Sequence, residues 1–163
     1  MQIVHNLMVK LLGLLLEVCM ALLVLDVLLG VVSRYVMGSQ VPWTEELACL
    51  LLVWSAFLGI ALAFNSRAHL GIDLVVNMMD TKSRKVAMVF AHLVTIVFTV
   101  VVFLHGGYYL LHKALYFTPN EMPALHIPDA VMYLPIPIAG FFILFFELNN
   151  FAADLQDGKG KEA

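Results

Sequence analysis

The sequence predicts an all-α integral membrane protein with four transmembrane helices, and three observations support that fold class. First, 62% of the 163 residues are hydrophobic and 13% are charged, whereas soluble domains carry roughly 25% charged residues. Second, four apolar runs long enough to cross a bilayer are separated by short polar segments. Third, most lysines and arginines fall on one predicted side. The whole chain, 1–163, should therefore form a single four-helix membrane domain.

The first two predicted helices span residues 11–32 and 44–64. Residues 11–32 are too long an apolar run for a signal peptide and lack a small-residue cleavage site, so we expect a retained helix. In the second helix, the eighteen residues 47–64 carry no charge, and such a run covers about 27 Å. Pro42 suits the first helical turn, and Thr44 is a candidate N-cap. This pair should therefore cross the bilayer twice.

The third and fourth predicted helices span residues 86–111 and 127–147. Pro128, Pro135 and Pro137 lie near the start of the fourth helix. Because prolines free backbone carbonyls, this helix should be kinked and packed against a neighbour that satisfies them. Residues 69–80 are too short to span and should form an amphipathic segment at the membrane interface between helices two and three. Residues 152–163 should be a polar tail.

The lysines and arginines predict the orientation of the chain. If the chain crosses four times, seven of them share one side, namely Lys10, Arg67, Lys82, Arg84, Lys85, Lys159 and Lys161. Only Arg34 and Lys113 lie on the other side. We therefore expect both termini in the cytoplasm, and the loops 33–46 and 112–129 outside.

Four polar residues inside the predicted helices are candidates for function. An intramembrane carboxylate costs about 2.5 to 3.5 kcal/mol on insertion scales. Glu17 and Asp26 are nine residues apart, which places them on opposite faces of the first helix and favours packing or interface roles. His92 and His105 lie about 140° apart on the third helix. Since no other predicted helix contains a histidine, haem ligation is not favoured.

The start of the second helix holds several candidate contact residues. Trp43 suits the membrane interface, and Glu45 and Glu46 complement the dipole of the helix that follows. Arg34, on the same predicted side, could pair with either glutamate and pin the first helical hairpin. The plainer interpretation of these residues is a helix start next to an aromatic belt.

One face of the second helix is lined by small residues. Ala48, Ser55, Gly59 and Ala63 share this face. In lipid, small residues let another helix backbone approach closely, so this face should be packed. Whether the neighbour belongs to this chain or to a partner stays open.

These residues together carry a resemblance to a known family. The stretch contains Ser33-Arg34-Tyr35, then Pro42-Trp43-Thr44-Glu45-Glu46-Leu47, then Trp54-Ser55-Ala56-Phe57-Leu58-Gly59, and then Ala68-His69 and Ile72-Asp73-Leu74. This order resembles the small membrane subunit of tripartite ATP-independent periplasmic (TRAP) transporters. The shared motifs are concentrated in residues 33–74, whereas length and helix count agree with the family over the whole chain.

The resemblance implies a scaffold subunit in the bacterial inner membrane. Such a subunit sits beside a large membrane subunit that carries the substrate and sodium sites and moves like an elevator. A periplasmic substrate-binding protein delivers organic acids, such as C4-dicarboxylates or sialic acid, for sodium-coupled uptake. By residue match, candidate contact residues lie at the outer rim (Arg34, Trp43, Glu45, Glu46) and at the cytoplasmic exit (His69, Asp73). Structural pinning and partner contact are their expected roles.

The residues alone leave two other classes open. A self-sufficient four-helix exporter of the small multidrug type would use a carboxylate in its first helix, for which Glu17 is the candidate. A haem-bearing membrane anchor would need facing histidines and would show a Soret band. Cys19 and Cys49 lie in apolar runs without metal-ligand spacing. We therefore expect no cofactor, metal ion or catalytic residue, and no enzymatic activity.

Overall fold

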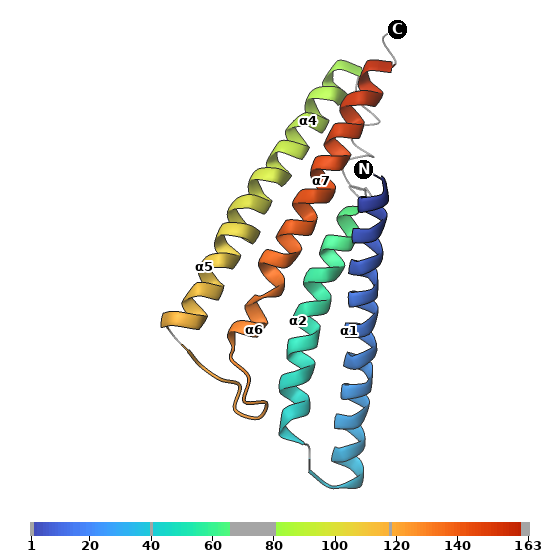
Figure 1. The fold of residues 1–163 in the computed structure, drawn as a ribbon. Coiled ribbons are helices and arrows are strands. Elements are labelled where there is room, and N and C mark those ends of the chain that lie inside the picture. Colours follow the sequence, from blue (N-terminus) through green and yellow to red (C-terminus); the bar gives the residue numbers. More distant parts are fainter. Residues whose placement is uncertain (1, 40, 66–80, 118, 161–163) are drawn as a thin grey trace.

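The computed structural model describes residues 2–39, 41–65, 81–117 and 119–160, and these residues form four helical rods (Figure 1). The first two rods are α1 (Gln2–Val36) and α2 (Pro42–Asn65). The third rod joins α4 (Thr81–Phe98), the π-helical segment η1 (Thr99–Gly106), α5 (Gly107–His112) and the π-helical segment η2 (Lys113–Phe117). The fourth rod joins α6 (Ala130–Tyr133) to α7 (Pro135–Gly160).

All four rods are long and apolar enough to cross a membrane. The candidate spans are His5–Val36, Pro42–Asn65, Val86–Phe117 and Ala130–Ala153. The prediction of four spanning helices is therefore confirmed. The predicted bounds are wrong at several ends, because α1 begins at residue 2, the third rod runs on to residue 117, and the fourth begins at residue 130. An apolar run shows which part of a helix lies in the hydrocarbon layer. The helix itself can extend beyond that layer through polar residues, because its backbone hydrogen bonds are made within the helix.

The rods lie side by side in the order α1, α2, α7 and third rod (Figure 1). The start of α1 and the end of α7 lie at one end of this row, which we call the terminal end. The connection from α1 to α2 and residues 119–129 lie at the opposite end, which we call the loop end. An even number of crossings explains why the start of α1 and the end of α7 share one end. The assignment of the terminal end to the cytoplasm remains a prediction, and the predicted amphipathic segment 69–80 lies outside the described residues.

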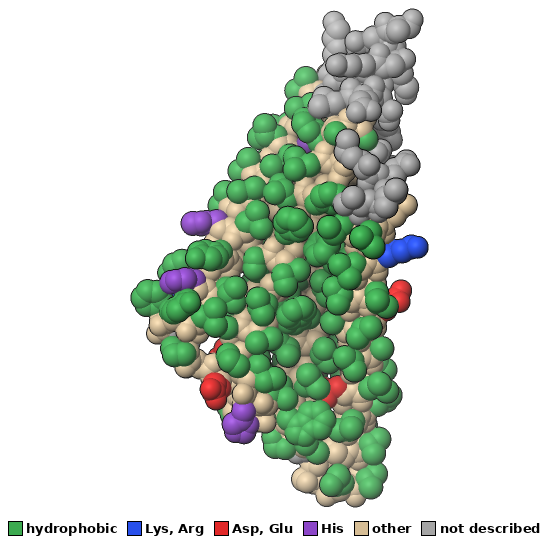
Figure 2. All heavy atoms as spheres, in the orientation of Figure 1, with side chains coloured by type: hydrophobic (Ala, Val, Ile, Leu, Met, Phe, Trp, Pro, Cys, Tyr) green, Lys and Arg blue, Asp and Glu red, His purple; other side chains and the backbone are tan. Residues whose placement is uncertain are grey.

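The apolar core lies where α1, α2 and α7 meet. It contains Leu12 of α1, Leu58 and Ala61 of α2, and Ala139, Phe142, Ile143 and Phe146 of α7. The rings of His5 and Phe146 pack in a T-shaped arrangement, with their centroids 5.6 Å apart. The two edge rods, by contrast, carry most of the exposed apolar side chains, and hydrophobic side chains cover much of the face seen in Figure 2. Helices α2 and α7 are therefore the inner elements, and the outward faces of α1 and the third rod are open to lipid or a partner.

The fourth rod breaks at Leu134, between α6 and α7. Pro135 has no N–H, so the carbonyl of Val131, four residues earlier, loses its usual helical donor. The indole Nε1–H of Trp54 in α2 donates to that oxygen at 3.1 Å. The helix is thus interrupted at this point, and the prediction that a neighbour satisfies a freed carbonyl is confirmed.

Two glycines allow the third rod to approach the fourth closely. A Cβ added to Gly140 would lie 2.7 Å from Cβ of Phe103, and a Cβ added to Gly107 would lie 2.9 Å from Cγ2 of Ile136. Such separations are too short for real carbon atoms, so only glycine fits at either position without movement of the helices. The third rod and α7 therefore lie in close contact at these two glycines.

Candidate functional site: a brace at the loop end

Residues 119–129, at the loop end, form a hydrogen-bonded hairpin that connects the third and fourth rods. The N–H of Met122 donates to the carbonyl of Ile127 at 2.9 Å, and the N–H of Asp129 donates to that of Asn120 at 3.0 Å. His126 adopts a φ of 55°, in the left-handed region, and its N–H donates to the carbonyl of Met122. The hairpin is thus closed by its own backbone.

Glu46 of α2 binds the tip of this hairpin. Its carboxylate accepts hydrogen bonds from the N–H of Ala124, at 3.0 and 3.1 Å to its two oxygens, and from the N–H of Leu125, at 2.9 Å. Charge-assisted hydrogen bonds of this kind are roughly twice as strong as neutral ones. Glu46 therefore holds the hairpin against the first turns of α2. Together with the Trp54 to Val131 bond, this contact forms what we call the loop-end brace.

Helices α1 and α2 also come close together at the loop end. A Cβ added to Gly30 would lie 3.3 Å from Oγ1 of Thr44. Thr44 is buried, and its hydroxyl donates to the carbonyl of Val41 at 2.8 Å. The predicted N-cap role of Thr44 is therefore wrong. The helix already begins at Pro42, whose fixed φ suits the first helical position and whose missing N–H needs no acceptor there.

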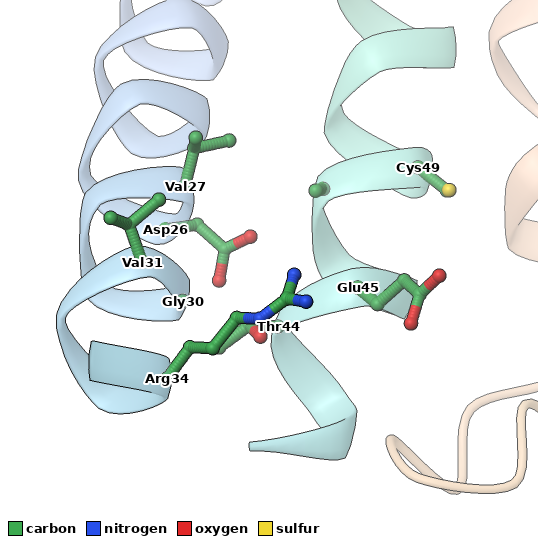
Figure 3. A pocket seen from close by; sticks show the side chains of 9 residues that line it. Asp26, Val27, Gly30, Val31, Arg34, Thr44, Glu45 and Cys49 are labelled. Atoms are coloured by element: carbon green, nitrogen blue, oxygen red, sulfur yellow. The ribbon is translucent and has the colours of Figure 1, made fainter. Parts of the chain in front are cut away.

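A groove of about 270 Å³ lies beside this contact between α1 and α2. Figure 3 shows the carboxylate of Asp26 in the gap between the two helices, the side chain of Arg34 reaching toward the same gap, and Glu45 projecting from α2 away from α1. Asp26 is only 6% exposed, and neither of its oxygens has a hydrogen-bond partner among the described residues. Asp26, for which a packing or interface role was predicted, thus lies between α1 and α2, the two helices of the first helical pair.

The predicted pairing of Arg34 with Glu45 or Glu46 is wrong. The structure, over the residues it describes, contains no ion pair between Arg34 and either glutamate, and Glu46 instead binds backbone N–H groups of the hairpin. Two amide donors at fixed positions hold a carboxylate at less entropic cost than a long, exposed arginine side chain would. Glu45 is exposed, and Trp43 is 37% exposed at the start of α2.

The small-residue face of α2 is packed by this chain only in part. Ser55 is buried, but a Cβ added to Gly59 would meet nothing within 4 Å, and Ala63 is exposed. No described residue packs closely on the Gly59 and Ala63 portion, so close packing there stays a prediction. The other two candidate residues, His69 and Asp73, lie outside the described residues.

A second set of polar contacts joins the helices nearer the terminal end. Nδ1 of His92 in α4 lies 2.7 Å from a carboxylate oxygen of Glu147 in α7, and both side chains are buried. The amide of Asn150 donates to the carbonyl of Phe64 in α2 at 3.2 Å. His105 is exposed on η1. The expectation that polar residues at helix interfaces are satisfied is thus confirmed for His92.

Neither Glu147 nor Asn150 stands out in the sequence as a candidate contact residue. The available signal was an acidic residue directly after a long apolar run, in a chain whose preceding predicted helix contains a histidine. A carboxylate at such a position needs a partner, and a histidine on a neighbouring helix can supply one. The partner could not be chosen without knowing that α7 lies beside the third rod.

The fold and its polar contacts define a four-helix integral membrane protein that is braced near both ends of its row of helices. A family model for the DctQ component of tripartite ATP-independent periplasmic transporters matches residues 5–157. The chain belongs to this family and is a TRAP transporter small permease subunit.

Several relatives are named as TRAP transporter permease proteins for different substrates. The C4-dicarboxylate TRAP transporter small permease protein DctQ of Rhodobacter capsulatus is 29% identical over 108 residues, which cover 66% of this chain and 47% of that protein. The sialic acid TRAP transporter permease protein SiaT of Haemophilus influenzae is 29% identical over 130 residues, covering 79% of this chain and 20% of that protein. The ectoine TRAP transporter small permease protein TeaB of Halomonas elongata is 25% identical over 153 residues, covering 90% and 77%. The chain therefore spans about half, or less, of the first two relatives.

Proposed function

We propose that this chain is the static scaffold subunit of a TRAP-type secondary transporter in the bacterial inner membrane. The observation that carries the proposal is the bracing of the helices near both ends of the row. Glu46 fixes the hairpin to α2 at the loop end, and the buried contact of His92 with Glu147 joins α4 to α7 nearer the terminal end. Rods tied together in this way resist sliding past one another, which suits a support rather than a moving element.

The proposed partners are a large elevator-type membrane subunit and a periplasmic substrate-binding protein. The exposed outward faces of α1 and the third rod offer apolar surface for the first partner. If the termini are cytoplasmic, the hairpin 119–129 lies on the periplasmic side, where the second partner would be. Membership in a family of tripartite transporters supports both pairings.

The proposed activity of the assembly is sodium-coupled uptake of an organic solute. The names of the relatives include a C4-dicarboxylate, sialic acid and ectoine as substrates. We propose an organic acid, such as a C4-dicarboxylate or sialic acid, for the complex that contains this chain. The substrate would bind to the other subunits, so the present chain contributes support and not selectivity.

Reconstitution of purified subunits in liposomes tests this proposal. Radiolabelled solute should enter only when this chain, the large subunit and the binding protein are all present with an inward sodium gradient. Liposomes that contain this chain alone should show no uptake and no export. Transport by this chain alone would contradict the scaffold proposal and support the self-sufficient exporter instead.

A further inference from the structure

The outward face of α1 carries a carboxylate that contacts no polar group among the described residues. Helix α1 is at the edge of the row (Figure 1). Leu14, Glu17, Ala21, Leu25 and Leu28 are all exposed, and their three- and four-residue spacing places them on one face of the helix. We call these five residues the α1 outer face. It is apolar except for Glu17.

The register between α1 and α2 gives the depth of Glu17. The two helices are antiparallel, and Gly30 is beside Thr44. Glu17, thirteen residues before Gly30, is therefore level with Phe57, thirteen residues after Thr44. Phe57 is about 10 Å from one end of the apolar run 47–64 and about 15 Å from the other. Glu17 is thus exposed near the middle of the layer that α2 spans.

Glu17 has no hydrogen-bond or ion-pair partner among the described residues. Lys10 is exposed, but it lies two helical turns, about 10 Å, closer to the terminal end. Carboxylates in transmembrane helices are costly in lipid and almost always face other helices or a water-filled cavity. A group outside this chain should therefore contact Glu17.

We propose that the α1 outer face docks against a transmembrane helix of the large permease subunit, and that this helix donates a hydrogen bond to Glu17 from a lysine or arginine. This inference rests on the proposed function, because it assumes that subunit as the neighbour. Ala21, one turn from Glu17, lets the partner backbone approach closely. The carboxylate thus fixes the depth at which the partner helix packs.

Two other occupants fit the face less well. A phospholipid has its charged headgroup at the membrane surface, whereas Glu17 lies near the middle of the layer. A second copy of this chain would have the same orientation in the membrane, and a two-fold contact through this face would bring two Glu17 carboxylates together at one depth. Like charges in low dielectric repel, so the symmetric contact is disfavoured.

The decisive variant is Glu17→Leu, studied both in the isolated chain and in the complex. Leucine is favourable in lipid, so the isolated chain should insert normally and unfold at the same or a higher temperature. Retention of the large subunit during affinity purification should fall roughly three- to twentyfold, the range for loss of one interhelical hydrogen bond in a membrane. Glu17→Gln keeps one acceptor oxygen, so its retention of the large subunit should be intermediate between that of Glu17→Leu and that of the wild type. Glu121→Gln removes an exposed charge from the hairpin and serves as the control with wild-type retention.

A photo-crosslinking residue at position 21 identifies the occupant directly. Crosslinks to the large subunit support the proposal, whereas crosslinks to a second copy of this chain or to lipid alone overturn it. The proposal is also overturned if the Glu17→Leu chain retains as much of the large subunit as the wild-type chain does. If the wild-type chain binds no large subunit at all, the proposed function itself fails, and the two failures are thereby distinguished.

Discussion

Removing the carboxylate of Glu46 should loosen the hairpin 119–129 and destabilise the isolated chain. In Glu46→Ala, the N–H groups of Ala124 and Leu125 both lose a charged acceptor. Leaving a buried donor unsatisfied costs about 1 to 3 kcal/mol. Since both amides are only part-buried, we use the lower part of that range for each and expect a total loss of about 2 to 3 kcal/mol.

The assay combines unfolding with amide exchange. Denaturant titration in detergent micelles gives the free energy of unfolding, and hydrogen exchange reports the amides of residues 124 and 125. Both amides should exchange faster in Glu46→Ala. Glu46→Gln retains one acceptor oxygen and should lose about 1 kcal/mol. Glu45→Gln changes the adjacent, exposed glutamate and should stay within about 0.5 kcal/mol of wild type. Equal stability and equal exchange in Glu46→Ala and Glu45→Gln would refute the brace.

Three further changes test the other contacts by the same unfolding measurement. Gly140→Ala should cost about 1 to 3 kcal/mol because the third rod must move away from α7, whereas Gly59→Ala, with open space around it, should gain about 0.5 to 1 kcal/mol; equal effects would contradict the close approach. Trp54→Phe removes the donor to the freed carbonyl in the fourth rod and should cost about 1 to 2 kcal/mol, and an unchanged stability would show that another group satisfies that carbonyl. His92→Ala breaks a buried contact with a carboxylate on α7 and should cost about 3 kcal/mol. His105→Ala changes an exposed position and should be nearly neutral. A larger loss of stability in His105→Ala than in His92→Ala would contradict the polar contact nearer the terminal end.

The helices and the break in the fourth rod could be predicted because their causes are local. An uncharged run of eighteen residues is long enough to cross the hydrocarbon layer whatever surrounds it. A proline removes a hydrogen bond at a known position, so Pro135 made a break in the fourth helix predictable. The ends of the helices were harder to predict, since polar residues continue a helix beyond the membrane without any change in backbone hydrogen bonding.

The pairing of polar groups between helices could not be predicted from spacing alone. The order of the rods, with α7 between α2 and the third rod, brings Glu147 to His92, fifty-five positions away in the sequence. The sequence marks Glu46 as a candidate contact residue that could pair with Arg34, but its carboxylate accepts hydrogen bonds from backbone N–H groups of the hairpin. Backbone amides have no signature in side-chain chemistry, and the fold of the loop decides where they point.

Locking the brace covalently is the most direct test of the claim that this subunit is a static scaffold. Glu46→Cys and Leu125→Cys can be introduced after Cys19 and Cys49 have been replaced by alanine, and a short bifunctional maleimide then joins α2 to the hairpin. Solute uptake is measured in liposomes that contain the complete transporter, before and after crosslinking. A static scaffold predicts that the crosslinked complex transports at least as fast as the same complex without the linker. Loss of uptake on crosslinking would contradict the claim, because it would show that α2 and the hairpin must move apart during transport.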